Sequence, residues 1–149
     1  EFGIRNSEFG MNDAPNSLDG CYPLPAIERA VVAETDSNPI RQKSFSFALM
    51  TVSLCRELQA DREYVISKQL MRSGTSIGAN VEEAVSAESR RDFLHKLNLA
   101  LKEARESHYW LRLLDASDIQ VAADLKGRLA AADELIRLLV AITRTVTRG

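Results

Sequence analysis

The stretch that decides the fold is Phe93-Leu-His-Lys-Leu-Asn-Leu-Ala-Leu-Lys-Glu-Ala-Arg-Glu-Ser-His-Tyr-Trp-Leu-Arg-Leu-Leu114. Its apolar residues recur at helical spacing, and the predicted inward stripe is Phe93, Leu97, Ala100, Ala104, Leu111 and Leu114. A second apolar stripe, built from Leu99, Trp110 and Leu113, lies beside the first. One bundle core cannot cover both stripes, so we expect the second to form an interface.

The same spacing predicts three more helices, over about residues 43–60, 64–87 and 120–147. The central stretch itself extends from an N-cap at Ser89 to about Ala116, and Ser117 or Asp118 is expected to cap the last helix. Residues 43–60 carry two apolar faces, and the sequence does not decide which of them points into the core. One face consists of Phe45, Ala48, Leu49, Val52 and Cys55, and the other of Phe47, Leu54 and Leu58. Because the connections are short, the sequence predicts an all-α, antiparallel up-down-up-down four-helix bundle.

An irregular acidic arm is expected before the bundle. Residues 1–10 repeat Glu-Phe-Gly-like units ahead of Met11, so we expect them to be cloning-derived. Residues 11–42 hold all four prolines and form the predicted arm, in which Pro25, Ile27 and Val31 permit one short helix. The bundle is assigned to residues 43–149.

Charge and cysteine content restrict the function classes. The chain has a net charge of −2, but residues 43–149 hold 16 basic and 14 acidic residues, whereas residues 1–42 hold 3 and 7. A mildly basic body therefore carries an acidic arm. Cys21 and Cys55 offer neither a metal spacing nor a disulfide framework, which favours a reducing cytoplasm. No apolar run is long enough to span a membrane, so no membrane partner is expected.

Catalytic and metal-binding signatures are not found in the sequence. A di-metal bundle needs Glu-x-x-His pairs, but Glu106 is followed by Tyr109 at that offset, and His95 and His108 lie 13 residues apart. No nucleophile-base set or glycine-rich phosphate loop can be assembled. We therefore expect no metal, no cofactor and no enzymatic activity.

A polar stripe follows the predicted second helix. Short polar groups at Ser76 and Asn80 cost helix propensity, so tertiary contacts are expected to justify them. The preferred interpretation is a polar network between neighbouring helices or subunits, and the alternatives are a solvated face or a ligand site. Its predicted members are Arg72, Ser76, Asn80, Glu83, Glu103 and Glu106.

Two interaction surfaces are predicted. Trp110 is the expected anchor of an oligomer interface, with the monomer core as the alternative place for its ring. The interface residues are Leu99, Trp110, Leu113, Leu135, Leu138 and Ile142. A string of cations along the third helix could contact nucleic-acid phosphates, but a solvated helix with ion pairs is the preferred interpretation. These cations are Arg90, Arg91, Lys96, Lys102 and Arg105.

Two runs of this sequence resemble a known family. They are Arg72-Ser-Gly-Thr-Ser-Ile-Gly-Ala-Asn-Val-Glu-Glu-Ala84 and Asp92-Phe-Leu-His-Lys-Leu-Asn-Leu-Ala-Leu-Lys-Glu-Ala-Arg-Glu106, the latter followed by Tyr109-Trp-Leu-Arg-Leu-Leu114. Both are similar to the bacterial four-helix-bundle proteins named after intervening sequences in 23S ribosomal RNA genes, also called S23 ribosomal proteins. The likeness covers about residues 45–146.

The resemblance implies an up-down bundle that assembles as a ring-like homopentamer. It also implies kinship with accessory proteins of diversity-generating retroelements, which bind nucleic acid and a reverse transcriptase through basic surfaces. We therefore expect a cytoplasmic, non-catalytic homo-oligomer that acts as a scaffold or adaptor for a protein or RNA partner. The alternative is an accessory protein that binds RNA or DNA directly through the cations of the third helix.

Overall fold

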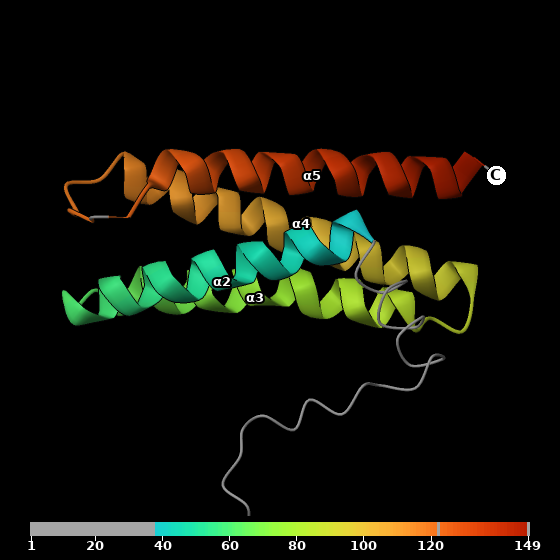
Figure 1. Ribbon diagram of the computed structural model, residues 1–149, viewed down its shortest axis with the longest axis horizontal. Helices are drawn as coiled ribbons and strands as arrows, with labels where there is room; N and C mark the ends of the chain where they lie inside the picture. The colour runs from blue at the N-terminus through green and yellow to red at the C-terminus, as the bar shows by residue number, and fades with distance from the viewer. Residues whose placement is uncertain (1–37, 122, 149) are drawn as a thin grey trace, which may run out of the picture.

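The computed structural model of the chain describes residues 38–121 and 123–148. These residues form four helices, α2 (Pro39–Ala60), α3 (Val65–Val85), α4 (Arg90–Asp115) and α5 (Leu125–Arg148). Figure 1 shows them running alternately in opposite directions along one long axis. The predicted all-α four-helix bundle is confirmed. Residues 1–10 and the suggested short helix near Pro25 lie outside the described residues.

Each helix packs against two others, in a closed order around the core. Contacts join α2 to α3, α3 to α4, α4 to α5 and α5 to α2, whereas α2 does not pack against α4, nor α3 against α5. Helix α2 therefore lies diagonally across the bundle from α4, and α3 lies diagonally across it from α5. The contact between α2 and α5 is the sparsest of the four. Opposite corners of the molecule thus belong to α2 and α4.

Side-chain caps fix where the helices begin. Asn38 Oδ1 accepts a hydrogen bond of 3.3 Å from the Ile40 amide, and Pro39 occupies the first helical turn, so α2 starts four residues before the predicted boundary. Ser89 Oγ accepts from the Asp92 amide at 3.1 Å, as the sequence predicted. The prediction for α5 was wrong, because its first turn is capped by Asp124 rather than by Ser117 or Asp118.

The linker before α5 explains this error. Asp124 Oδ1 accepts a hydrogen bond of 2.9 Å from the Gly127 amide, which satisfies one free N–H of the first turn of α5. Ser117 Oγ instead accepts from the Ile119 amide at 3.3 Å and stabilises a turn that follows α4. Ser117 thus supports the connection, and α5 begins at Leu125, five residues later than predicted.

The structure decides which face of α2 is inward. Its buried residues are Ile40, Ser44, Phe47, Thr51, Leu54, Cys55 and Leu58. Phe45 and Leu49 point away from the core and are 65% and 57% exposed. Small residues make this choice possible, because a Cβ atom built on Gly74 of α3 would lie 2.6 Å from Thr51 Oγ1. The close approach of α2 to α3 therefore depends on Thr51 and Gly74.

The core extends through α4 and α5. In α4 the buried residues include Leu97, Ala100, Ala104, Leu111 and Leu114, as predicted, while Phe93 is only partly buried. The buried residues of α5 are Ala132, Leu135, Leu139 and Thr143. Thr143 is tolerated there because its Oγ1 donates to the Leu139 carbonyl at 2.9 Å. Among the described residues, no helix is long and apolar enough to cross a lipid bilayer.

Candidate functional site

Two exposed apolar surfaces lie on the diagonal helices α2 and α4. The first, called the α2 patch, consists of Phe45, Leu49 and Val52, which follow one another at i, i+4 and i+7 along the outer side of α2. Phe45 and Leu49 rank among the most exposed large apolar residues of the described chain. The sequence contained this surface as one of two possible faces of the helix, but did not tell which face was outward.

The second surface, called the α4 patch, consists of Leu99, Tyr109, Trp110 and Leu113. Tyr109 is 54% exposed and Leu113 is 38% exposed. Trp110 is half-buried, because one side of its ring packs against the core while its Nε1 donates to Glu106 Oε1 at 3.3 Å. The Tyr109 ring meets the Trp110 ring edge-on, with centroids 5.1 Å apart. The predicted anchor thus lies at the edge of the patch, and Tyr109 and Leu113 form its exposed part.

One residue of the α5 half of the predicted interface is corrected by the structure. Leu135 is buried within its own subunit and is 1% exposed, so it cannot contact another copy. Leu138 and Ile142 are half-buried and pack against the same core. The physical reason is that the buried stripe of α5 consists of Ala132, Leu135, Leu139 and Thr143, so Leu135 lies on the inward side of the helix and not on its outer side.

Ion pairs connect α3 with α4, and they include four of the six residues of the predicted polar network. Arg72 Nη1 lies 3.7 Å from Glu103 Oε2, and its Nη2 donates to Glu106 Oε1. Lys96 of α4 pairs with Glu83 of α3. The hydrogen bond to Glu106 holds the pKa of Arg72 above its ordinary value.

Ser76 and Asn80 take no part in these pairs. Asn80 Nδ2 donates to the Ser76 carbonyl at 2.8 Å, which is a bond within α3. A different pair of serines makes the buried polar contact between the helices, since Ser107 Oγ donates to Ser73 Oγ at 2.9 Å. Within one subunit, the described residues show no hydrogen bond from Ser76 or Asn80 to another helix, and a contact of these two side chains with a second subunit stays a prediction.

The five predicted nucleic-acid contacts divide into two groups. Lys96 is bound to Glu83, and Arg90 donates to the carbonyl of Val146 in α5, so both have structural partners. The other three cations are exposed and form no ion pair with any described residue; these are Arg91, Lys102 and Arg105. The structure thus leaves three of the five predicted cations available to a ligand.

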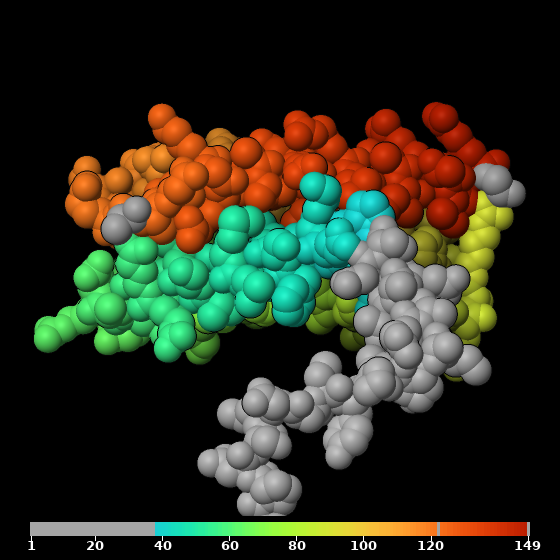
Figure 2. All heavy atoms as spheres, in the orientation of Figure 1, coloured from blue at the N-terminus to red at the C-terminus, as the bar shows by residue number. Residues whose placement is uncertain are grey.

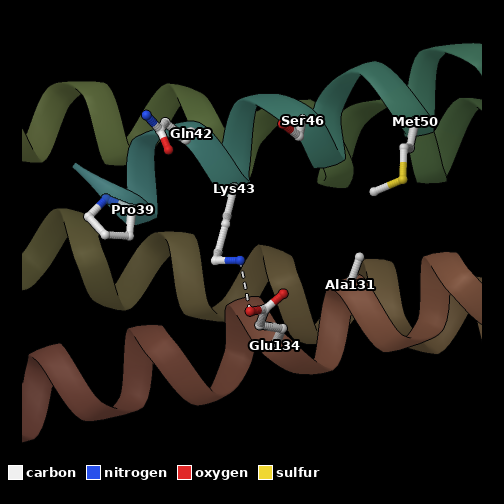
Figure 3. Close-up of a pocket in the computed structure, with 7 residues that line it drawn as sticks. All are labelled: Pro39, Gln42, Lys43, Ser46, Met50, Ala131 and Glu134. Carbon is white, nitrogen blue, oxygen red and sulfur yellow. Dashed lines mark ion pairs between the residues drawn. The ribbon is translucent and has the colours of Figure 1, made fainter. Parts of the chain in front are cut away.

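A shallow groove of about 350 Å³ runs between α2 and α5, where the bundle contacts are sparsest. Figure 2 shows these two helices side by side on one face of the molecule. Lys43 of α2 crosses the groove to Glu134 of α5, with 2.8 Å between Nζ and Oε1 (Figure 3). Farther along, Arg128 Nε donates to the Met50 carbonyl at 3.3 Å. These polar bridges join α2 and α5 across the groove.

Potential reactive groups have ordinary structural roles. Burial raises the pKa of the Cys55 thiol to about 11, and its Sγ donates to the Ser67 carbonyl at 3.2 Å. His108 Nε2 lies 3.3 Å from Asp133 Oδ1, which links α4 to α5. Within residues 38–121 and 123–148, no group of three or more His, Cys, Asp or Glu side chains is arranged to hold a metal ion.

Comparison with known proteins places the chain in a family. The family model described as 23S rRNA-intervening sequence protein matches residues 36–141, which is more than half of the chain. The chain belongs to this family. A similar solved structure is a protein with unknown function from the S23 ribosomal protein family of Bacteroides thetaiotaomicron VPI-5482. It is 44% identical, has a TM-score of 0.67, and the alignment covers 70% of this chain and 97% of that one. No curated protein matches the chain.

Membership of the 23S rRNA-intervening sequence family confirms the resemblance stated from residues 72–84 and 92–114. The family match includes both the α2 patch and the α4 patch. The molecular function of the S23 structure is described as unknown, so the family supplies a fold and leaves the function open. The function must therefore be argued from the surfaces of the bundle.

Proposed function

We propose that this S23-family protein is a non-catalytic scaffold that assembles with copies of itself into a ring. One observation carries the proposal: the two exposed apolar patches lie on α2 and α4, which are diagonal in the bundle and do not touch. Apolar patches on a soluble bundle are typical of protein interfaces. Copies of the same chain are the partner we propose for both patches.

The position of the patches favours a head-to-tail contact. If the α2 patch of one subunit covers the α4 patch of the next, the growing assembly keeps one free patch of each kind at its two ends, so addition continues until the assembly closes. A symmetric dimer would instead pair a patch with itself and leave the other patch exposed. A closed ring covers all the patches. Five is the number of subunits that the family resemblance implies.

The exposed side chains supply enough free energy for such a contact. Full burial of a large apolar side chain contributes about 1.5–3 kcal/mol, so covering the exposed part contributes roughly 1–2 kcal/mol for Phe45 or Leu49 and about 0.5–1 kcal/mol for Leu113. A charge introduced in either patch should remove this contribution and add a desolvation cost. One substitution should therefore weaken each contact at least tenfold, since about 1.4 kcal/mol corresponds to a factor of ten.

Light scattering after size exclusion tests this proposal. The wild-type protein should have a mass of roughly five times the 16.6 kDa of one chain. Leu49→Glu and Leu113→Glu should each lower the mass at the same concentration. Val65→Glu is the matched control, because Val65 is 74% exposed but lies at the start of α3, outside both patches. A wild-type monomer at micromolar concentration, or equal masses for all four proteins, would refute the ring.

The location in the cell is part of the same proposal. Cys55 is a free, buried thiol within the described residues, which is typical of proteins in a reducing compartment. We therefore propose that the ring works in the cytoplasm. Fractionation with an antibody against the native protein should recover it with cytoplasmic markers, and recovery with periplasmic or membrane markers would contradict this assignment.

Nucleic-acid binding is the second candidate function. The observation that favours it is the exposure of Arg91, Lys102 and Arg105 without an ion pair in the described part of the chain. Exposed arginines and lysines bind phosphate groups, and a ring would multiply each cation by the number of subunits. A gel shift at two salt concentrations tests this function. Binding that weakens as salt rises would support it, and no binding at low ionic strength would exclude it.

A further inference from the structure

The outer side of α5 carries cations that extend the basic surface of α4. Arg137 and Arg144 lie seven residues apart on α5, and Arg105 and Arg112 lie seven residues apart on α4. Seven residues make about two helical turns, so the two arginines of each pair lie on the same side of their helix. All four side chains are exposed, and none forms an ion pair with a described residue. We call these four arginines the basic face.

An ion pair between α4 and α5 shows that both arginine pairs face the same side. His108 of α4 contacts Asp133 of α5 at 3.3 Å. Arg105 and Arg112 lie three residues before and four residues after His108, on the flank of α4 that turns toward α5. Arg137 follows Asp133 by four residues on α5. The four arginines therefore surround one interhelical contact and form a single surface.

The register of the two helices gives the length of the basic face. The His108–Asp133 pair and the hydrogen bond from Arg90 to the Val146 carbonyl fix α4 and α5 as antiparallel neighbours. Arg105 is then level with Arg137, while Arg112 and Arg144 lie at opposite ends. With a helical rise of about 1.5 Å per residue, the face is about 22 Å long. One strand of a double helix places about six phosphates over that length, at roughly 3.4 Å each.

Acidic side chains are fewer than arginines along the basic face. Glu103 and Glu106 lie on the opposite flank of α4, where they bind Arg72 of α3. Asp133 and Glu134 precede Arg137 on α5 by four and three residues. Asp133 faces His108, and Glu134 pairs with Lys43 of α2. Asp115 follows Arg112 by three residues and offsets part of the positive charge at this end of the face. The overall charge of −2 thus hides a local concentration of positive charge.

We propose that the basic face binds the phosphate backbone of a double-stranded nucleic acid, with α5 supplying half of the contacts. This inference rests on the second candidate function and extends it from α4 to a surface shared by two helices. Guanidinium groups bind phosphates through paired hydrogen bonds, and a backbone is recognised without base contacts. A single strand is the weaker candidate, because such sites stack bases on aromatic rings. The nearest exposed ring, Tyr109, belongs to the α4 patch that the proposed ring covers.

Fluorescence anisotropy with the full chain and a labelled duplex of 24 base pairs tests this assignment, in separate DNA and RNA arms. Four phosphate contacts give a slope of about −3.6 for log K against log salt, so wild-type affinity should fall roughly 100-fold between about 50 and 200 mM salt. Arg137→Glu/Arg144→Glu should weaken binding at least tenfold and reduce the slope by about 2. Binding in either arm supports the backbone assignment, and the stronger arm identifies the duplex.

The matched control is Arg62→Glu/Lys68→Glu, which makes the same change of charge at exposed positions of the α2–α3 side. It should change affinity less than threefold. If it weakens binding as much as the α5 variant does, the loss reflects total charge and the basic face is overturned. If Arg91→Glu/Lys102→Glu abolishes binding while Arg137→Glu/Arg144→Glu does not, the second candidate function stands and the α5 contribution is refuted. No binding of either duplex at about 50 mM salt would exclude both.

Each variant needs a readout of folding and assembly beside the binding curve. Circular dichroism and light scattering should match the wild type for all three double variants, because every substituted residue is exposed. A variant that loses helicity is replaced by the corresponding Arg→Gln pair, which removes the charge without adding an acid. The Arg→Gln pair at positions 137 and 144 should still reduce the salt slope by about 2, and an unchanged slope would overturn the inference.

Discussion

Replacing Gly74 by Ala tests the close contact between α2 and α3. A Cβ atom at position 74 would lie 2.6 Å from Thr51 Oγ1 and 2.7 Å from Thr51 Cγ2, both far inside normal contact distance. Thr51 cannot rotate away easily, because it is β-branched and its Oγ1 donates to the Phe47 carbonyl at 2.9 Å. Overpacking of this kind costs about 1–3 kcal/mol, while replacing glycine in a helix returns roughly 0.5–1 kcal/mol.

Gly78 provides the matched control, since it lies one turn farther along α3. A Cβ atom there would be 3.7 Å from the Ser44 carbonyl oxygen, which is an ordinary contact. Gly78→Ala should therefore raise the free energy of unfolding by about 0.5–1 kcal/mol, whereas Gly74→Ala should lower it by up to about 2 kcal/mol. Urea unfolding at one fixed protein concentration measures both.

A second substitution tests the cause of the Gly74 effect. Adding Thr51→Ala to Gly74→Ala removes the two closest atoms, so the double variant should recover part of the lost stability relative to the sum of the single changes. Two outcomes would refute the reasoning: Gly74→Ala stabilises the protein as much as Gly78→Ala does, or the two changes at Thr51 and Gly74 are simply additive.

Two further predictions concern the core. Leu135→Ala should lower the free energy of unfolding by about 2–5 kcal/mol, and Leu138→Ala should lower it by about half as much, because only Leu135 is fully buried. Urea unfolding measures both losses. Equal losses would contradict the assignment of Leu135 to the core. The buried thiol of Cys55 has a pKa raised from 9.0 to about 11, so its contribution to stability is complete below pH 9 and is lost as the pH rises toward 11. Cys55→Ser should flatten this part of the stability curve measured between pH 8 and 11, and an unchanged slope would show that another group is responsible.

The helices themselves were predictable because their signals are local. Ser89 was identified as a cap from its place before an apolar stripe, and the buried leucines of α4 follow the predicted spacing. The first residue of α5 was harder to predict, because the segment before this helix contains several residues that could act as its N-cap. Ser117 and Asp124 both accept hydrogen bonds from backbone amides, and only the folded chain shows that Asp124 caps α5.

The inward faces of α2 and α5 were harder to predict, since their apolar content is nearly equal on two sides. Phe45 and Leu49 look as suited to a core as Phe47 and Leu54, and the deciding factor is the fit of Thr51 against Gly74 across two helices. Leu135 was misplaced because α5 has apolar residues on two sides, and packing turned inward the side that carries Ala132, Leu135 and Leu139. Sequence periodicity indicates that a helix has a second apolar side, but packing decides which side remains exposed.

Sequence periodicity also did not predict which charged residues of different helices lie together. Pairing of Arg72 with Glu106, and of Lys96 with Glu83, depends on the register between α3 and α4. Arg137 was not identified as part of a basic surface, because its neighbours Arg105 and Arg112 lie on another helix. Adding charges along one helix at a time cannot reveal a face that two helices share.

Covalent cross-linking tests the head-to-tail ring most directly. In a Cys21→Ser background, Leu49→Cys labels the α2 patch and Leu113→Cys labels the α4 patch, while native Cys55 stays buried. We expect a bis-maleimide with a spacer of about 10 Å to join a Leu49→Cys chain to a Leu113→Cys chain. The protein that carries both changes should give a ladder of cross-linked products that ends at a closed oligomer. Cross-linked dimers of Leu49→Cys alone or of Leu113→Cys alone, with no product in the mixture of the two, would contradict the head-to-tail ring.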